Sequence, residues 1–199
     1  MLDNKELEII KKEIENLIQQ EKIIVEKNSK GKFTDFFLEN SRKSFDSARV
    51  LMDLSINPKL QETLGYSNFD GSLWTINASY YSMFYMVRGL LENFGIKIKS
   101  DSNTQSIHQM VFQALIYFFY MNKRLERKLI EDFHEAIQES SEILGKEKAK
   151  KLVEEYKSEK DKRGIFTYEL GQIAMQNKAE TSIKRAKFFN QEIRKMIKL

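Results

Sequence analysis

The scarcity of turn-forming residues constrains the fold of this chain more than any other feature of its sequence. Its 199 residues include one proline and eight glycines. Strands of a sheet need frequent turns, and those turns depend heavily on these two residue types. Apolar residues also recur every three or four positions along much of the chain, which is the period of an amphipathic helix. The sequence therefore predicts an all-α protein.

Breaks in this periodicity set the bounds of the expected helices. Asn57-Pro58 should end one helix, because proline disfavours the helical state of the residue before it. Gly95 and Gly145 are expected helix stops. The segment 72–93 is apolar on nearly all sides, which is typical of a helix buried within a bundle. The expected helices cover residues 3–27, 34–56, 72–93, 107–120, 123–144, 146–162 and 178–197.

The sequence NSKGK at residues 28–32 marks the expected boundary between two parts of the chain. Glycine and small polar residues in such a run favour a linker. We therefore expect an amphipathic helical arm over 1–30 and a helical bundle domain over 31–199.

A heptad-like apolar stripe runs along the arm. Its members are Leu7, Ile10, Ile14, Leu17 and Ile24. The stripe can pack on the body of its own chain or on a second copy, and the sequence leaves both possibilities open. It is one of two reasons to expect a homodimer.

Composition excludes several classes of function. The chain has no cysteine, which excludes a disulfide scaffold, a thiolate metal site and a cysteine nucleophile. Its two histidines, His108 and His134, form no zinc motif, so we expect no metal and no cofactor. The N-terminus is too charged for a signal peptide, and the most apolar run, 110–121, is too short to cross a bilayer. We expect a cytoplasmic protein that does not bind membranes, whose net charge of +4 permits an anionic partner such as RNA.

Several motifs resemble those of HEPN domains, the nucleotide-binding helical domains of prokaryotes and higher eukaryotes. NASYYSMFYMVRGLL at 77–91 is similar to the family signature S-x-Y-Y-A-M-F-x-A, and the polar loop with His108 is similar to its K-x-H region. Arg163 and Tyr168 have the R-x4-Y spacing of one subfamily's R-x-x-A-D-Y element. The final helix is similar to the pattern A-x-x-x-I-x-x-A-x-x-F. The matching positions are Ala78, Tyr80, Tyr81, Met83 and Phe84 in the first motif and Ala179, Ile183, Ala186 and Phe189 in the last.

The resemblance covers about residues 34–197 and implies both a fold and a function. The fold would be a HEPN-like up-and-down bundle of four main helices, with additional N-terminal and peripheral helices. HEPN proteins often form homodimers, and their arginine region faces a cleft. Many are metal-independent ribonucleases with an R-x(4–6)-H motif, often toxins beside a small nucleotidyltransferase antitoxin. In this chain Tyr168, five positions after Arg163, stands where that motif has its histidine, and no histidine lies near Arg163.

Arg163 is the central residue of the expected site. A guanidinium stays charged and holds phosphate with a fork of donors, so Arg163, with the neighbouring Lys162, suits the binding of RNA or a nucleotide. Tyr168 is a poor base near neutral pH, because the unperturbed pKa of tyrosine is about 10. It could donate a hydrogen bond or stack on a nucleobase. Cleavage of RNA without a metal needs both a base and a cation, so this pair suits binding better than cutting.

Other polar residues have both a structural and a functional interpretation. His108 can be a helix cap, a buried hydrogen-bonding group or a base. Arg88 interrupts an apolar helix, where a charge is costly unless it is paired, so it can meet Glu92 or line the same pocket as Arg163. His134 is expected on the surface.

Two groups of residues have structural interpretations that we favour. The aromatic run in 80–85 is expected in the core rather than as a stacking platform. The basic residues of the last helix are expected on a solvated face. They are Lys184, Arg185, Lys187, Arg194, Lys195 and Lys198.

Three functions remain open at this point. The first is an RNA- or nucleotide-binding protein of a toxin–antitoxin or defence system with a nucleotidyltransferase-type partner. The second is a metal-independent endoribonuclease with a non-standard site, for which Arg163, Tyr168 and His108 are the candidate catalytic residues. The third is a non-catalytic protein–protein interaction module.

Overall fold

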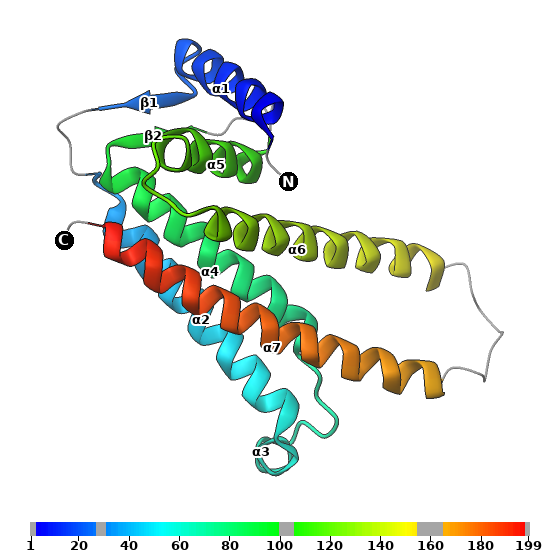
Figure 1. Cartoon of the computed structure of the whole chain (residues 1–199). Coiled ribbons are helices and arrows are strands. Elements are labelled where there is room, and N and C mark those ends of the chain that lie inside the picture. The colour runs from blue at the N-terminus through cyan, green and yellow to red at the C-terminus, as the bar shows by residue number, and fades with distance from the viewer. Residues whose placement is uncertain (1–2, 27–30, 100–105, 155–164, 198–199) are drawn as a thin grey trace.

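The computed structural model describes residues 3–26, 31–99, 106–154 and 165–197, with the backbone alone over 144–154 and 165–174. These residues form an all-α bundle, as the sequence predicted, together with one small sheet that it did not predict (Figure 1). The elements in chain order are α1 (Asn4–Gln19), β1 (Ile23–Val25), α2 (Thr34–Ile56), α3 (Pro58–Leu64), α4 (Ser72–Asn93), β2 (Ile96–Ile98), α5 (Ile107–Leu115), the π-helical turn η1 (Ile116–Tyr120), α6 (Arg127–Glu154) and α7 (Ile165–Met196).

The helix α4 forms the centre of the bundle, as its apolar sequence predicted. Its side chains Met83, Val87 and Leu90 are fully buried. Small residues bring α2 close to α4, because the hydroxyl of Ser41 donates to the carbonyl of Ser82 at 2.7 Å and the hydroxyl of Ser82 donates to the carbonyl of Ser41 at 2.9 Å. These reciprocal bonds satisfy hydroxyl groups that would otherwise be costly to bury.

The predicted arm packs on its own chain. Ile10, Ile14 and Leu17 are buried in the same core as residues of α4 and α5. The arm helix ends at Gln19, earlier than expected, because Glu21 takes a left-handed conformation with φ 56°. The chain then enters β1, which pairs antiparallel with β2. The predicted stripe therefore ends at Leu17, and Ile24 belongs to a strand.

The expected breaks in the last third of the chain are wrong. Residues 123–144 and 146–162 were expected to form two helices separated by Gly145, but α6 runs without interruption from Arg127 to Glu154. The last helix begins at Ile165 rather than near residue 178. A glycine costs a helix only about 1 kcal/mol relative to alanine, so one glycine does not have to end a helix that continues on both sides.

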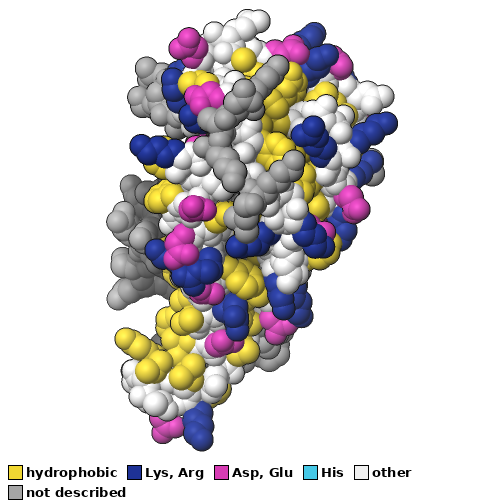
Figure 2. All heavy atoms as spheres, turned by 90° about the vertical axis from the view of Figure 1, so that its left-hand side faces the viewer, with side chains coloured by type: hydrophobic (Ala, Val, Ile, Leu, Met, Phe, Trp, Pro, Cys, Tyr) yellow, Lys and Arg dark blue, Asp and Glu magenta, His cyan; other side chains and the backbone are white. Residues whose placement is uncertain are grey.

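Large apolar side chains are exposed where α2 meets α3. Ile56, Leu64 and Tyr66 are all more than half exposed. Figure 2 shows hydrophobic side chains gathered at the end of the molecule that carries α3, whereas charges of both signs alternate over much of the rest of this face. Such surfaces are typical of interaction sites.

Among the described residues, no helix is both long enough and apolar enough to cross a membrane.

Gly31→Ala is expected to lower the free energy of unfolding by about 1–3 kcal/mol, because there is no space for the added methyl group. A Cβ atom at this position would lie 2.1 Å from the carbonyl oxygen of Glu92 and 2.2 Å from its Cγ atom. Urea denaturation followed by circular dichroism measures the change. The adjacent exposed residue provides the control, since Lys32→Ala should change stability by less than about 0.5 kcal/mol. Equal stabilities of the two variants would contradict this account of the turn.

Candidate functional site

A cavity between α4, α5 and α6 brings together the two histidines of the chain. Its volume is about 500 Å³, and we call it the histidine pocket. Its wall combines aromatic rings with hydroxyl and amide groups, and no Lys or Arg is among its described lining residues. The lining residues are Ile10, Tyr80, Tyr81, Ser106, His108, Gln109, Phe112, Gln113, His134, Ile137, Ser140 and Ser141.

A hydrogen bond between Tyr80 and His108 forms the inner wall of the pocket. Tyr80 is 5% exposed, and its hydroxyl group contacts Nδ1 of His108. The His108 ring lies against Phe84, with centroids 4.6 Å apart, and against Tyr81, with centroids 6.0 Å apart. Burial raises the pKa of Tyr80 above its ordinary value, and burial lowers the pKa of His108. Both groups are therefore neutral near pH 7.

The Tyr80 bond also allows us to assign the proton of neutral His108 to one of its two ring nitrogens. Among the described residues, the Tyr80 hydroxyl has no other hydrogen-bond partner than His108. A buried hydroxyl that donates to nothing is costly, so the Tyr80 O–H donates to Nδ1. Neutral His108 then carries its proton on Nε2, and that N–H is the group that it offers to a ligand. A hydrogen-bond acceptor is the complementary chemistry.

The stability of the protein is expected to fall with acid because of His108. Its pKa is lowered in the folded state, so the unfolded chain binds a proton more readily. The stabilising contribution is complete above the unfolded pKa of about 6.5 and is lost as the pH falls from there through the folded pKa. Urea midpoints measured from about pH 7.5 to about pH 5 test this, with His108→Phe expected to show a smaller loss over the same range. Parallel curves for the two proteins would contradict the assignment.

The outer wall of the pocket comes from α5 and α6. His134 is exposed, as expected, and its ring stacks on Phe112 with centroids 5.3 Å apart and an interplanar angle of 18°. Ser140 is buried, and its hydroxyl donates to Oδ1 of Asn77 at 2.6 Å. A flat neutral ring with polar edges is a better match to these walls than a phosphate group, which needs cations.

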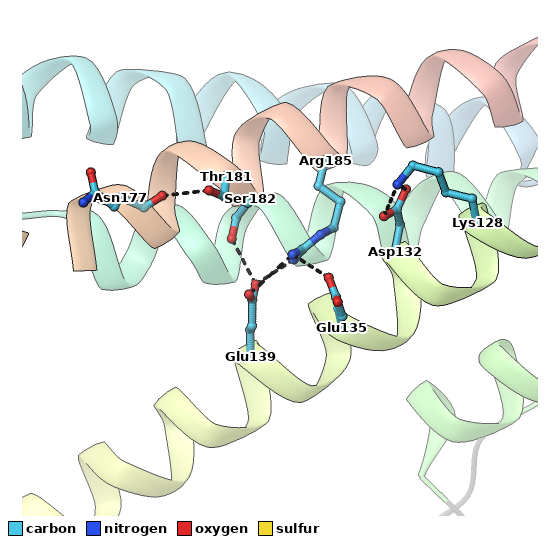
Figure 3. Close-up of polar contacts among 8 residues, drawn as sticks. All are labelled: Lys128, Asp132, Glu135, Glu139, Asn177, Thr181, Ser182 and Arg185. Carbon is cyan, nitrogen blue, oxygen red and sulfur yellow. Dashed lines mark hydrogen bonds and ion pairs between the residues drawn. The ribbon is translucent and has the colours of Figure 1, made fainter. Parts of the chain in front are cut away.

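Ion pairs between α6 and α7 hold the outer wall in place (Figure 3). Arg185 of α7 donates to Glu139 at 2.7 Å and to Glu135 at 2.8 Å, and the hydroxyl of Ser182 donates to Glu139 at 3.1 Å. The Arg185 side chain is only 10% exposed. The expectation that Arg185 lies on a solvated basic face is therefore wrong. Partly buried pairs of this kind fix the relative position of two helices more firmly than exposed pairs do.

The residues predicted at the centre of the site are not among the described residues that line the histidine pocket. Lys162 and Arg163 lie outside the described residues. Tyr168 lies in the first turns of α7, where the backbone alone is described. Ser182 meets α6 beside the pocket wall, and a helix rises about 20 Å from Tyr168 to Ser182. Tyr168 therefore lies well along α7 from the contact between Ser182 and Glu139, toward the end of α7 that lies far from α5 (Figure 1).

Arg88 occupies a different place from the other predicted binding residues. Its guanidinium carbon lies 4.5 Å from the centroid of the Phe37 ring, on the side of α4 that faces α2. Burial lowers the pKa of Arg88, and the nearby carboxylate of Glu92 opposes that shift. The sequence offered two environments for Arg88, a place beside Glu92 or a pocket shared with Arg163. The structure shows Glu92 nearby. Arg88 is not among the residues that line the histidine pocket.

The sequence indicated the histidines and the tyrosines but not the pocket that they line together. Phe112 follows His108 by four positions, and Ser141 follows His134 by seven, so each pair shares a helix face. This spacing was the available signal. It could not show that the two faces oppose each other, because that depends on how α5 and α6 pack.

Comparison of the chain with models of protein families, with curated proteins and with solved structures found no match. Among the described residues, no three His, Asp or Glu side chains form a cluster that could hold a metal ion. The chemistry of the site is therefore interpreted from its own geometry.

Proposed function

We propose that this chain binds RNA or a nucleotide, with one nucleobase in the histidine pocket. One observation carries the proposal: Tyr80, Tyr81 and His108, which carry the resemblance to HEPN domains, meet in one cavity of about 500 Å³. Aromatic and imidazole rings stack on unpaired bases, and uncharged polar groups pair with the base edges. The Nε2–H of His108 would donate to a ring nitrogen or a carbonyl oxygen of the base.

The charges around the pocket suggest the path of an RNA strand. The neighbouring groove carries Glu13 and Glu135, which repel phosphate. A strand would therefore leave the pocket past Ser141 and follow α6 toward the connection that contains Lys162 and Arg163. Lys162 and Arg163 would hold phosphates, and Tyr168, about 20 Å along α7 from Ser182, would stack on a base. This separation favours an RNA of several nucleotides over a mononucleotide.

The geometry of His108 favours binding over cleavage. A general base needs a free lone pair toward the substrate, whereas neutral His108 offers an N–H. The proposed role is therefore a HEPN-like RNA- or nucleotide-binding protein that works as a homodimer in a toxin–antitoxin or defence system with a nucleotidyltransferase partner. Incubation of concentrated protein with RNA in the presence of a chelator separates the two activities. We expect the RNA to remain intact, and cleavage that depends on Arg163 would instead support the ribonuclease.

Arg163→Ala is expected to weaken the binding of a short single-stranded RNA about fivefold and to leave the binding of a mononucleotide unchanged. The reason is that the mononucleotide reaches only the histidine pocket. Fluorescence anisotropy with labelled RNA and calorimetry with AMP, CMP, GMP and UMP measure the two affinities. Arg194→Ala removes an exposed arginine of α7 and is the matched control. Failure of the parent protein to bind either RNA or any of the four mononucleotides would overturn the proposal.

A further inference from the structure

A second hollow lies beside the histidine pocket, between α1 and α6. Its volume is about 560 Å³, and we call it the acidic groove. Ile10, Phe112 and Ile130 supply apolar surface, and four carboxylates stand along α1 and α6. The residues that line it are Glu6, Ile9, Ile10, Glu13, Gln109, Phe112, Gln113, Arg127, Ile130, Glu131, His134 and Glu135.

The α1 wall has the pattern of a helix face that lacks its partner helix. Glu6, Ile9 and Glu13 have the spacing i, i+3 and i+7, so they lie along one side of α1. Ile9 is 48% exposed, whereas Ile10 beside it is buried on the body of the chain. An apolar residue flanked by like charges along a helix is typical of a face that pairs with a helix of opposite charge.

The charge of the groove is opposite to that of the whole chain. Four carboxylates and the guanidinium of Arg127 line it, which gives a net charge of −3 with His134 neutral, whereas the chain has +4. Arg127 pairs with Glu131 at 2.9 Å, and Arg185 pairs with Glu135 at 2.8 Å. Among the described residues, no ion pair neutralises Glu6 or Glu13. Glu6 accepts from the backbone N–H of Asp3, and Glu13 accepts from the amide of Gln113.

We propose that the acidic groove docks a basic amphipathic helix of a partner protein. Such a helix would place a leucine-like side chain against Ile9 and Phe112 and a Lys or Arg on each side of it, toward Glu6 and Glu13. A second copy is a poor occupant, because a two-fold pairing through this groove would set acid against acid. Nucleic acid is excluded by the same repulsion. The proposal does not rest on the function assigned to the histidine pocket, although the two hollows share the lining residues Ile10, Gln109, Phe112, Gln113 and His134.

Two peptides of about four helical turns test the charge and shape of the groove. The first is a fluorescein-labelled helix with leucine along one face and lysine on both sides of it, and the second has glutamate in place of each lysine. The basic peptide is expected to bind the whole chain with a dissociation constant in the micromolar range. Its affinity should fall as the salt concentration rises, because screening reduces its attraction to the carboxylates. The acidic peptide is expected not to bind. Equal binding of both peptides, or no binding of the basic one, would overturn the proposal.

Matched variants show whether the peptide uses this groove. The double variant Glu6→Gln with Glu13→Gln removes two charges, and glutamine can keep the same hydrogen bonds. This double variant is expected to weaken the binding of the basic peptide about fivefold. Glu8→Gln with Glu15→Gln changes an exposed pair at the same spacing on α1 and should have a much smaller effect. Ile9→Ser should weaken binding about tenfold, and Val50→Ser, at a more exposed site on α2, should not. Equal effects of the groove and control variants would show that the peptide does not bind in this groove and would overturn the proposal. A dimer that forms without peptide and that Ile9→Ser abolishes in light scattering would instead assign the groove to a second copy of the chain.

Discussion

Phe133→Ala is expected to lower the free energy of unfolding by about 3–5 kcal/mol, which is a large part of the stability of a typical domain. Phe133 is 0% exposed and lies where three helices meet. Its ring stacks on Phe189 of α7 with centroids 5.4 Å apart and on Tyr80 of α4 with centroids 6.2 Å apart. Removal of the ring leaves a cavity that a close-packed core fills only in part. The same change removes the support behind Tyr80.

Guanidinium denaturation followed at the helical circular dichroism band measures this loss. Phe188→Ala is the matched control, because Phe188 precedes Phe189 on α7 but is 43% exposed. Its loss should be no more than about 1 kcal/mol. If the two alanine variants have the same stability, α6 does not pack on α4 and α7 as described.

His108→Phe is expected to weaken the binding of a mononucleotide about 10- to 100-fold, which rests on the proposed function. Phenylalanine keeps a flat ring for stacking but has no Nε2–H, so the acceptor on the base loses its partner inside a partly closed pocket. Calorimetry with the tightest of the four mononucleotides gives the change. His134→Phe alters an exposed ring on the outer wall and is expected to have a smaller effect.

A double variant separates loss of the ligand contact from loss of folding. His108→Phe alone leaves the buried Tyr80 hydroxyl without its partner, which costs about 1–3 kcal/mol of stability. Tyr80→Phe with His108→Phe removes both polar groups and should recover part of that stability. Nucleotide binding should remain weak in the double variant. Recovery of binding together with stability would show that His108 supports the fold without touching the ligand.

The sequence predicted the central part of the fold well because strong local signals determine it. Pro58 follows shortly after the end of α2, so this helix ends at Ile56 as expected. The apolar run of α4 is compatible only with a buried helix, and this helix covers Ser72–Asn93 as expected. The two short strands were missed. β1 is the run Ile23–Val25, whose β-branched residues favour a strand, but three residues carry too little pattern to outweigh a helical stripe. Gly145 was wrongly predicted to end a helix, because glycine lowers the stability of a helix locally. That local cost says nothing about the segments that pack against the helix before and after the glycine.

The candidate site could be predicted only in pieces. The motif residues Tyr80 and His108 were identified, yet their hydrogen bond joins positions 28 apart and depends on how α5 crosses α4. Arg185 was placed on the surface because it was assigned to the helix face opposite Ile183 and Ala186. Its partners Glu135 and Glu139 lie on another helix, which the sequence could not show. Periodicity shows which face a residue shares, and tertiary packing decides what that face meets.

The most direct test is nuclear magnetic resonance of the two imidazole rings in ¹⁵N-labelled protein near neutral pH, during titration with a mononucleotide. The account predicts that free His108 is neutral with its proton on Nε2, and that its ring signals shift saturably as the nucleotide binds. A His108 ring that is protonated on Nδ1, or whose signals stay unchanged while the nucleotide binds, would contradict it.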